Sequence, residues 1–274
     1  MTRTDAAALF DPMGTTALIT GASSGLGVGY AHELARRGAD LVLTARRLDR
    51  LESLAVDLAE RYGTVSTVIP LDLAAPGAVA ELVRDLTERD IHVGTLINNA
   101  GFGSYGSVVD APAEVVRSQV AVNVAALTEL TQALLPGLLT TALTHPRGAA
   151  LVNLASTAAF QPVPQLAVYA ATKAYVLSLT EALWYETRAT GLKVTAVCPG
   201  PTETEFFGVA GRSTAGPRRL MSVDEVVASS FAALDRRTPP PHTVTGRQNR
   251  ALAWFAGVSP RRAVVTVTGL LSRR

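Results

Sequence analysis

Residues 17–27 read ALITGASSGLG, a short apolar run followed by a glycine-rich turn and the start of a helix. Glycine at 21, 25 and 27 lets the backbone turn sharply and lets a phosphate approach without a Cβ in the way. The spacing is Gly-x3-Gly-x-Gly, unlike the more familiar Gly-x-Gly-x2-Gly of dinucleotide-binding folds. A plain tight turn is the alternative, but the order strand, turn, helix favours a phosphate-binding site.

Short apolar runs alternate with helical patterns on both sides of this turn. The expected strands cover residues 17–20, 41–44, 65–71, 95–98, 149–154 and 194–198, with a seventh near 243–245. The expected helices cover residues 24–37, 49–61, 78–86, about 113–135 and 168–187. This alternation predicts an α/β fold with a parallel sheet covered on both faces.

Composition narrows the classes of protein that this chain fits. Its 274 residues suit one large domain, and 48% apolar residues suffice for a sizeable core. A net charge of +2 argues against a nucleic-acid-binding protein. The single cysteine and four scattered histidines give no disulfide framework and no metal site. We see no secretory leader and no membrane-spanning run, so we expect a cytoplasmic protein.

Two arginines, Arg46 and Arg47, follow the second expected strand. A nucleotide with free ribose hydroxyls usually meets an acidic residue at this place. Guanidinium groups pair instead with a 2′-phosphate, which favours NADP(H) over NAD(H). The alternative is that both are solvated residues at a helix start, although the helix dipole mildly disfavours cations there.

The segment Tyr169-Ala170-Ala171-Thr172-Lys173 places a phenol and an ammonium on one helix face. A nearby cation favours the phenolate and lowers the tyrosine pKa, which would make Tyr169 a general acid or base. One such pair is usually only an amphipathic surface. Lys173, however, is one of two lysines in a chain with 23 arginines. Ser156 ends the fifth expected strand, where a hydroxyl can hold a carbonyl oxygen that gains charge. The alternative, which Ser156 on its own would favour, is a serine that satisfies backbone groups of the loop.

Two more motifs, Asn98-Asn99-Ala100-Gly101 and Cys198-Pro199-Gly200, follow the fourth and sixth expected strands. With the glycine turn, Ser156 and the Tyr-Lys segment, they resemble the short-chain dehydrogenase/reductase family over residues 14–246. The resemblance implies a Rossmann-like, doubly wound sheet of about seven strands. It also implies an enzyme that transfers a hydride between NAD(P) and a carbonyl/alcohol pair.

The resemblance gives each catalytic candidate a role. Tyr169 would donate or accept the proton, Lys173 would lower its pKa and bind the nicotinamide ribose, and Ser156 would orient the carbonyl. Asn123 matches the family residue that holds a water in a proton relay. From the residues alone, Asn123 lies in an apolar helix, where a buried amide needs partners, and local partners are the alternative role.

The resemblance also distributes the cofactor contacts over the strand ends. The expected contacts are Gly21, Ser23, Ser24, Gly25, Leu26 and Gly27 for the pyrophosphate, Arg46 and Arg47 for the 2′-phosphate, Asp72 and Leu73 for the adenine, Asn99, Ala100 and Gly101 near the ribose, Tyr169 and Lys173 beside them, and Pro199, Gly200, Thr202 and Thr204 for the nicotinamide. One departure is Ser24, because some NADP-dependent relatives carry a basic residue within the turn.

The loops beyond the strand ends are mainly apolar. This region is lined by Phe102, Tyr105, the run 160–164 and Phe206-Phe207. The set contains no arginine, the residue that would bind a carboxylate with two hydrogen bonds. We therefore expect an apolar ketone, aldehyde or alcohol as substrate. Helices near 113–135 and 168–187 resemble those that relatives use to pair subunits, which implies a homodimer or homotetramer.

The end of the chain differs from the rest. Residues 236–274 hold eight arginines and no acidic residue, whereas the remainder carries 17 basic against 23 acidic residues. We divide the chain into a catalytic domain, 1–246, and a basic amphipathic tail, 247–274, that ends in Arg273 and Arg274. The tail packs on the enzyme's own body, covers a partner subunit, or lies on an anionic membrane; the first is favoured.

The sequence thus predicts an NADP(H)-dependent oxidoreductase. A non-catalytic dinucleotide-binding sensor or scaffold is the first alternative, but it would not need all four of Asn123, Ser156, Tyr169 and Lys173. An isomerase or dehydratase is the second, but those relatives tend to have a larger substrate-binding portion after the last core strand.

Overall fold

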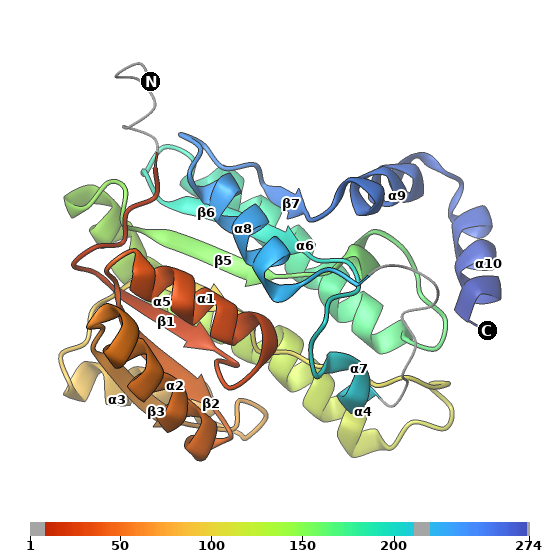
Figure 1. The fold of residues 1–274 in the computed structure, drawn as a ribbon. Coiled ribbons are helices and arrows are strands. Elements are labelled where there is room, and N and C mark those ends of the chain that lie inside the picture. Colours follow the sequence, from red (N-terminus) through yellow and green to blue (C-terminus); the bar gives the residue numbers. More distant parts are fainter. Residues whose placement is uncertain (1–8, 211–219, 273–274) are drawn as a thin grey trace.

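The computed structural model describes residues 9–210 and 220–272, and a seven-stranded parallel sheet forms its centre (Figure 1). The strand order is β3-β2-β1-β4-β5-β6-β7. The strands are β1 (Thr16–Thr20), β2 (Asp40–Ala45), β3 (Ser66–Pro70), β4 (Val93–Asn98), β5 (Ala150–Leu154), β6 (Lys193–Cys198) and β7 (His242–Val244). All seven predicted strands are present, and the doubly wound fold is confirmed.

Helices cover both faces of the sheet, as the buried strands require. They are α1 (Gly25–Arg36), α2 (Leu48–Tyr62), α3 (Ala78–Glu88), α4 (Ala113–Val120), α5 (Leu127–Thr144), α6 (Ala167–Thr187), α7 (Phe206–Ala210), α8 (Val223–Leu234), α9 (Arg247–Val258) and α10 (Arg261–Ser272). One core cluster joins α1, α2 and α8 to sheet residues such as Ile19 and Leu43. A second joins α3 and α5 to Leu18 and Leu96 on the opposite face.

The order of the strands reverses at β1, which has β2 on one side and β4 on the other. Connections leave a doubly wound sheet in opposite directions at such a point, and this opens a crevice beyond the carboxyl ends of the strands. The glycine turn follows β1, and the Asn-Asn-Ala-Gly motif follows β4. The fold therefore brings both motifs to the same crevice.

Several helical regions differ from the sequence prediction, and the short helix α7 is one that was not expected. The helix expected over about 113–135 runs from Ala113 to Thr144 and contains a π-helical stretch, Ala121–Ala126, between α4 and α5. The helix α8 was not predicted at all. It begins with a capping box in which Ser222 and Glu225 exchange side-chain and backbone hydrogen bonds, the pattern that stabilises a helix start.

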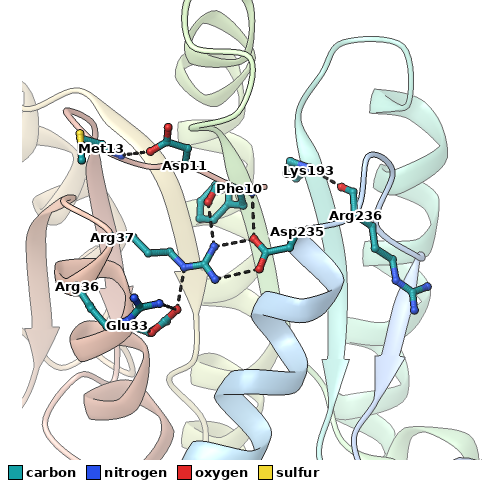
Figure 2. A network of polar contacts seen from close by, with 9 residues as sticks. All are labelled: Phe10, Asp11, Met13, Glu33, Arg36, Arg37, Lys193, Asp235 and Arg236. Carbon is teal, nitrogen blue, oxygen red and sulfur yellow. Dashed lines mark hydrogen bonds and ion pairs between the residues drawn. The ribbon is translucent and has the colours of Figure 1, made fainter. Parts of the chain in front are cut away.

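A polar network joins the ends of α1 and α8 to the segment before β1, as Figure 2 shows. Arg37, after α1, binds both carboxylate oxygens of Asp235, after α8, at 2.7 and 3.0 Å. The same guanidinium donates to Glu33 at 2.8 Å and to the carbonyl of Phe10 at 2.9 Å. The network fixes the segment before β1 to two helices of one layer.

The 113–144 run is the one helix in the described part of the chain that is long and apolar enough to cross a membrane. Its α5 part packs against β4 and places Leu130 and Leu138 in the core. A core helix of this composition passes the same test of length and hydropathy.

The C-terminal helices α9 and α10 extend from the last strand along one side of the molecule (Figure 1). Ala253 of α9 is buried, and the Thr268 hydroxyl of α10 donates to the carbonyl of Pro162 at 2.9 Å. Trp254 and Phe255 are 67% and 64% exposed, and Leu270 is 61% exposed. Each helix therefore touches the body with one face and leaves an apolar face uncovered in the described chain. Arg273 and Arg274 lie outside the described residues.

Candidate active site

The glycine turn adopts a conformation that other residues would strain. Gly21 and Gly25 have φ angles of +65° and +54°, in the region that favours glycine. A Cβ at Gly21 would lie 2.9 Å from the Cα of Ala100, and one at Gly27 would collide with the carbonyl oxygen of Gly21. The turn must therefore be glycine-rich to lie against the strand end of β4.

Thr20 and Asn99 hold this turn in place. The Thr20 hydroxyl accepts hydrogen bonds from the backbone N–H groups of Asn99 and Ala100, at 3.0 and 2.9 Å. The Asn99 amide donates in turn to the carbonyls of Thr20 and Gly21, at 2.9 and 3.1 Å. Asn99 was predicted near the ribose; its side chain here positions the glycine turn.

Arg47 reaches across the mouth of the crevice. Its guanidinium donates to the Ser23 hydroxyl at 3.2 Å and pairs with Glu205 at 2.9 Å. Arg50, in the first turn of α2, pairs with the same carboxylate at 2.6 Å. Arg46 is exposed and has no ion-pair partner among the described residues. The structure thus places Arg50, which the sequence did not single out, beside Arg47.

The predicted adenine contacts follow β3. Asp72 is exposed, and its carboxylate accepts a hydrogen bond from the Ala74 N–H at 3.0 Å, which shapes the turn. Leu73 is partly buried against the core cluster that contains α3 and α5. Both residues lie at the carboxyl end of the strand that neighbours β2.

Ser156 and Tyr169 meet beyond the end of β5. The Ser156 hydroxyl accepts a hydrogen bond from the Ala158 N–H at 3.1 Å and caps a short 3-10 helix, Thr157–Phe160. Burial raises the pKa of the Tyr169 phenol to about 12, while a hydrogen bond with Ser156 acts in the opposite direction. A phenol with this pKa keeps its proton at neutral pH.

Lys173 lies one helical turn after Tyr169, on the same side of α6. Its ammonium is 5.9 Å from the centroid of the Tyr169 ring and donates to the carbonyl of Leu154 at 2.5 Å. Burial lowers the pKa of Lys173 to about 8. The two side chains therefore face the same region, as the spacing predicts. The expected lowering of the tyrosine pKa is wrong in this structure, because burial outweighs the hydrogen bond with Ser156.

Asn123 lies within the π-helical stretch and is fully buried. Its amide exchanges two hydrogen bonds with the backbone of Phe102, at 2.9 and 3.1 Å, and donates to the Thr172 hydroxyl at 3.0 Å. π-Helical stretches often occur at functional sites. The side chain here joins the loop after β4 to the helix that carries Tyr169, so it has the local partners of the alternative role.

The loop after β6 packs against the glycine turn and against α9. Thr204 lies near Gly25, whose added Cβ would be 3.0 Å from the Thr204 methyl group. Thr202 is buried and donates to the carbonyl of Gly200 at 2.9 Å, and Pro199 accepts from the Thr157 N–H at 2.9 Å. A Cβ at Gly200 would collide with the side chain of Asn249. The C-terminal region thus contacts the predicted nicotinamide loop directly.

Only part of the expected apolar surface lies beside Tyr169. The Phe206 ring lies 5.0 Å from the Tyr169 ring, and a Cβ at Gly103 would be 2.8 Å from Phe206. Phe160 instead turns toward His242, with ring centroids 5.4 Å apart. The side chain of Phe207 lies outside the described residues. Phe206 is therefore the clearest apolar wall beside the phenol.

Several residues that sequence reasoning missed support this geometry. They are Thr20, Gln119, Thr172, Arg50, Glu205 and Asn249. Arg50 has a sequence signal, because it follows Arg47 by three positions at a helix start. The others are ordinary polar residues, and the contacts that bring them to the site join segments distant in the chain, as between Asn249 and Gly200. No group of three metal-ligating side chains occurs in the described ranges.

The model of the short chain dehydrogenase family matches residues 15–213. Sulfoacetaldehyde reductase 2 of Chromohalobacter salexigens is 38% identical over 199 residues, which are 71% of this chain and 75% of the relative. The chain therefore belongs to the short-chain dehydrogenase family and is an oxidoreductase of that type.

Two solved structures share the fold over most of the chain. A short-chain dehydrogenase from Sphingobium yanoikuyae in complex with NADPH is 35% identical, with a TM-score of 0.77 and 95% and 96% of the two chains covered. A bulky-bulky ketone specific alcohol dehydrogenase from Comamonas testosteroni is 31% identical, with a TM-score of 0.72 and 95% and 94% covered.

Proposed function

We propose that this enzyme is an NADP(H)-dependent reductase or dehydrogenase that acts on apolar carbonyl/alcohol pairs, with Tyr169 as its general acid/base. The convergence of Ser156, Tyr169 and Lys173 beyond the end of β5 carries the proposal. These three groups come from two elements and meet beside the crevice that the glycine turn lines.

The residues of this chain handle the oxygen and the proton. In the reductive direction the carbonyl oxygen accepts hydrogen bonds from the Ser156 and Tyr169 hydroxyls, and the phenol gives its proton to this oxygen as the C–H bond forms. A phenolate is left, and a proton from solvent restores the phenol. Lys173 stabilises the phenolate while its ammonium is charged. Asn123 fixes the loop after β4 against α6.

The described residues fit a dinucleotide with a 2′-phosphate. The glycine turn lies at a helix start, where backbone N–H groups suit a pyrophosphate, and the Arg47 guanidinium already binds an anionic group, the carboxylate of Glu205. When bound, the nicotinamide supplies or accepts the hydride. The full set of contacts that the family implies, from Gly21 to Thr204, is part of this proposal, and so is the water relay at Asn123.

An NADPH complex of the Sphingobium yanoikuyae relative supports the cofactor assignment. In this chain, Arg46 and Arg47 also support the assignment of NADP(H), because two cations lie where NAD-binding folds usually carry an acidic residue.

The substrate assignment depends on the surroundings of Tyr169. Phe206 and Gly103 make an apolar wall, and a bulky-ketone dehydrogenase is among the structural relatives. The sulfoacetaldehyde reductase relative has a small charged substrate in its name. The described loops, however, place no arginine beside Tyr169 to bind a sulfonate or carboxylate.

One experiment tests the whole proposal. Purified enzyme is mixed with NADPH and a panel of carbonyls that differ in size and polarity, and NADPH oxidation is followed. We expect turnover of bulky apolar ketones or aldehydes above that of small charged ones. The sensor alternative predicts NADPH binding with no turnover of any compound in the panel.

We also propose a cytoplasmic homodimer or homotetramer. Tyr175 of α6 and Val120 of α4 are 41% and 43% exposed in the single chain. Such exposure is expected of apolar residues that a second subunit covers in the oligomer. Light scattering on the purified enzyme tests the oligomer, and cell fractionation tests the location. The division at residue 246 stays a prediction, and so do the three roles weighed for the tail.

A further inference from the structure

Three strand ends are joined over the crevice by one cluster of charged residues. Arg47, after β2, donates to the hydroxyl and carbonyl of Ser23, after β1, at 3.2 and 3.4 Å. The same guanidinium pairs with Glu205, after β6, at 2.9 Å. Arg50 binds the other carboxylate oxygen at 2.6 Å. We call Arg47, Arg50 and Glu205 the clamp.

The clamp has excess positive charge, since two guanidinium groups share one carboxylate. All three side chains are partly exposed, between 38% and 46%. Water screens exposed ion pairs, so each contributes little free energy. A phosphate carries up to two charges and three acceptor oxygens, and it is therefore a stronger partner for the same guanidinium groups.

Resting on the proposed function, we propose that Glu205 is an internal competitor for the 2′-phosphate of NADP(H), and that Arg50 binds this phosphate together with Arg47. Glu205 then sets how strongly the enzyme prefers NADP(H) over NAD(H). A nucleotide without the 2′-phosphate leaves the clamp closed, whereas one with it displaces the Glu205 carboxylate from both arginines.

This assignment gives phosphate binding to Arg47 and Arg50, whereas the sequence analysis gave it to Arg46 and Arg47. Arg47 and Arg50 lie three positions apart at the start of α2, so both reach the same anion. Arg46 is exposed and contacts no anion in the described chain, so it adds to the local field without holding the carboxylate. Carboxylate removal should strengthen phosphate binding, and guanidinium removal should weaken it.

The experiment compares Glu205→Gln with the matched control Glu203→Gln. Glu203 is exposed in the same loop, so its variant loses the same charge outside the clamp. Dissociation constants of NADPH and NADH are measured by nucleotide fluorescence, and those of adenosine 2′,5′-bisphosphate and adenosine 5′-monophosphate by calorimetry.

We expect Glu205→Gln to bind NADPH and the bisphosphate about fivefold more tightly, with NADH and the monophosphate unchanged. Arg50→Ala should weaken NADPH and the bisphosphate roughly tenfold and leave the other two unchanged. Glu203→Gln should match the wild type.

Three results would overturn the inference. Weaker binding of all nucleotides by Glu205→Gln would show that the clamp helps to hold the cofactor and does not compete with it. Equal effects of Glu203→Gln and Glu205→Gln would reduce the effect to net charge. Unchanged binding by Glu205→Gln would remove the competition. A wild-type enzyme that binds neither NADPH nor NADH would instead contradict the proposed function itself.

Discussion

The crevice beyond β1, β4 and β5 and the C-terminal helices α9 and α10 are built in opposite ways. In the crevice, polar side chains such as Asn99 and Asn123 are bound by two or more partners, and the glycines have neighbours that exclude a Cβ. In α9 and α10 a narrow face touches the body, and Trp254, Phe255 and Leu270 are exposed. Where many contacts fix a residue, as in the crevice, the sequence shows a recognisable motif. Where a helix has few contacts with the body, as in α9 and α10, the sequence shows only a biased composition.

The largest effect that we predict is in the crevice. Tyr169→Phe removes the proton donor and keeps the ring against Phe206, so turnover should fall about 1000-fold. NADPH affinity and the melting temperature should stay near the wild-type values. Steady-state kinetics, fluorescence titration and thermal unfolding measure the three quantities. Wild-type turnover by this variant would eliminate Tyr169 as the general acid/base.

The next effect concerns cofactor choice. Arg46→Ala combined with Arg47→Ala should weaken NADPH binding roughly 100-fold, because two cations near the 2′-phosphate are lost, and should change NADH binding less than about twofold. Titration of both nucleotides checks this. An equal loss for NADPH and NADH would show that the arginines support the fold and not the phosphate.

A third prediction joins the two regions through Asn249. Gly200→Ala should destabilise the enzyme by about 1–2 kcal/mol, because the new methyl group meets the Asn249 side chain. Asn249→Ala alone should cost about 1 kcal/mol, since its 2.8 Å hydrogen bond to the Thr245 carbonyl is lost.

The double variant Gly200→Ala with Asn249→Ala decides whether α9 supports the active-site loop. The double variant should lose less free energy of unfolding than the two single variants lose together, as measured by denaturant unfolding. Additive losses would mean that α9 does not act on the loop, and the C-terminal helices would then be a separate appendage.

The sequence predicted the sheet within one or two residues at most strand ends, because buried parallel strands are short continuous apolar runs. The helix α8 was missed although Ser222 and Glu225 have the capping-box spacing. The π-helical stretch around Asn123 was not predicted, and the hydrogen bond of Asn123 with the loop after β4 joins residues that only the folded chain brings together.

The candidate site shows the same division. Tyr169 and Lys173 are four positions apart on one helix, so their proximity follows from the sequence. The pKa direction of Tyr169 does not, because burial depends on residues from other elements. Glu205 and Arg47 are separated by 158 positions, and only the folded chain brings them together.

The smallest effect should come from the exposed face of α9. Trp254→Ser with Phe255→Ser should leave turnover unchanged and shift stability by less than about 0.5 kcal/mol, because both side chains are mostly exposed and their rings contact each other. Light scattering and co-sedimentation with anionic liposomes are then compared between this variant and the wild type. Loss of an oligomer would assign the face to a subunit contact, and loss of liposome binding would assign it to a membrane.

The pH dependence of the two reaction directions tests the proton transfer at Tyr169 most directly. Lys173 has a pKa of about 8, so rates are compared well below it, between about pH 6 and pH 7. Alcohol oxidation needs the phenolate of a group with a pKa of about 12, so its kcat/KM should rise nearly tenfold per pH unit. Carbonyl reduction uses the protonated phenol, so its kcat/KM should stay flat. An oxidation rate that does not change with pH, or a Tyr169→Phe variant with the same rising profile, would contradict the account.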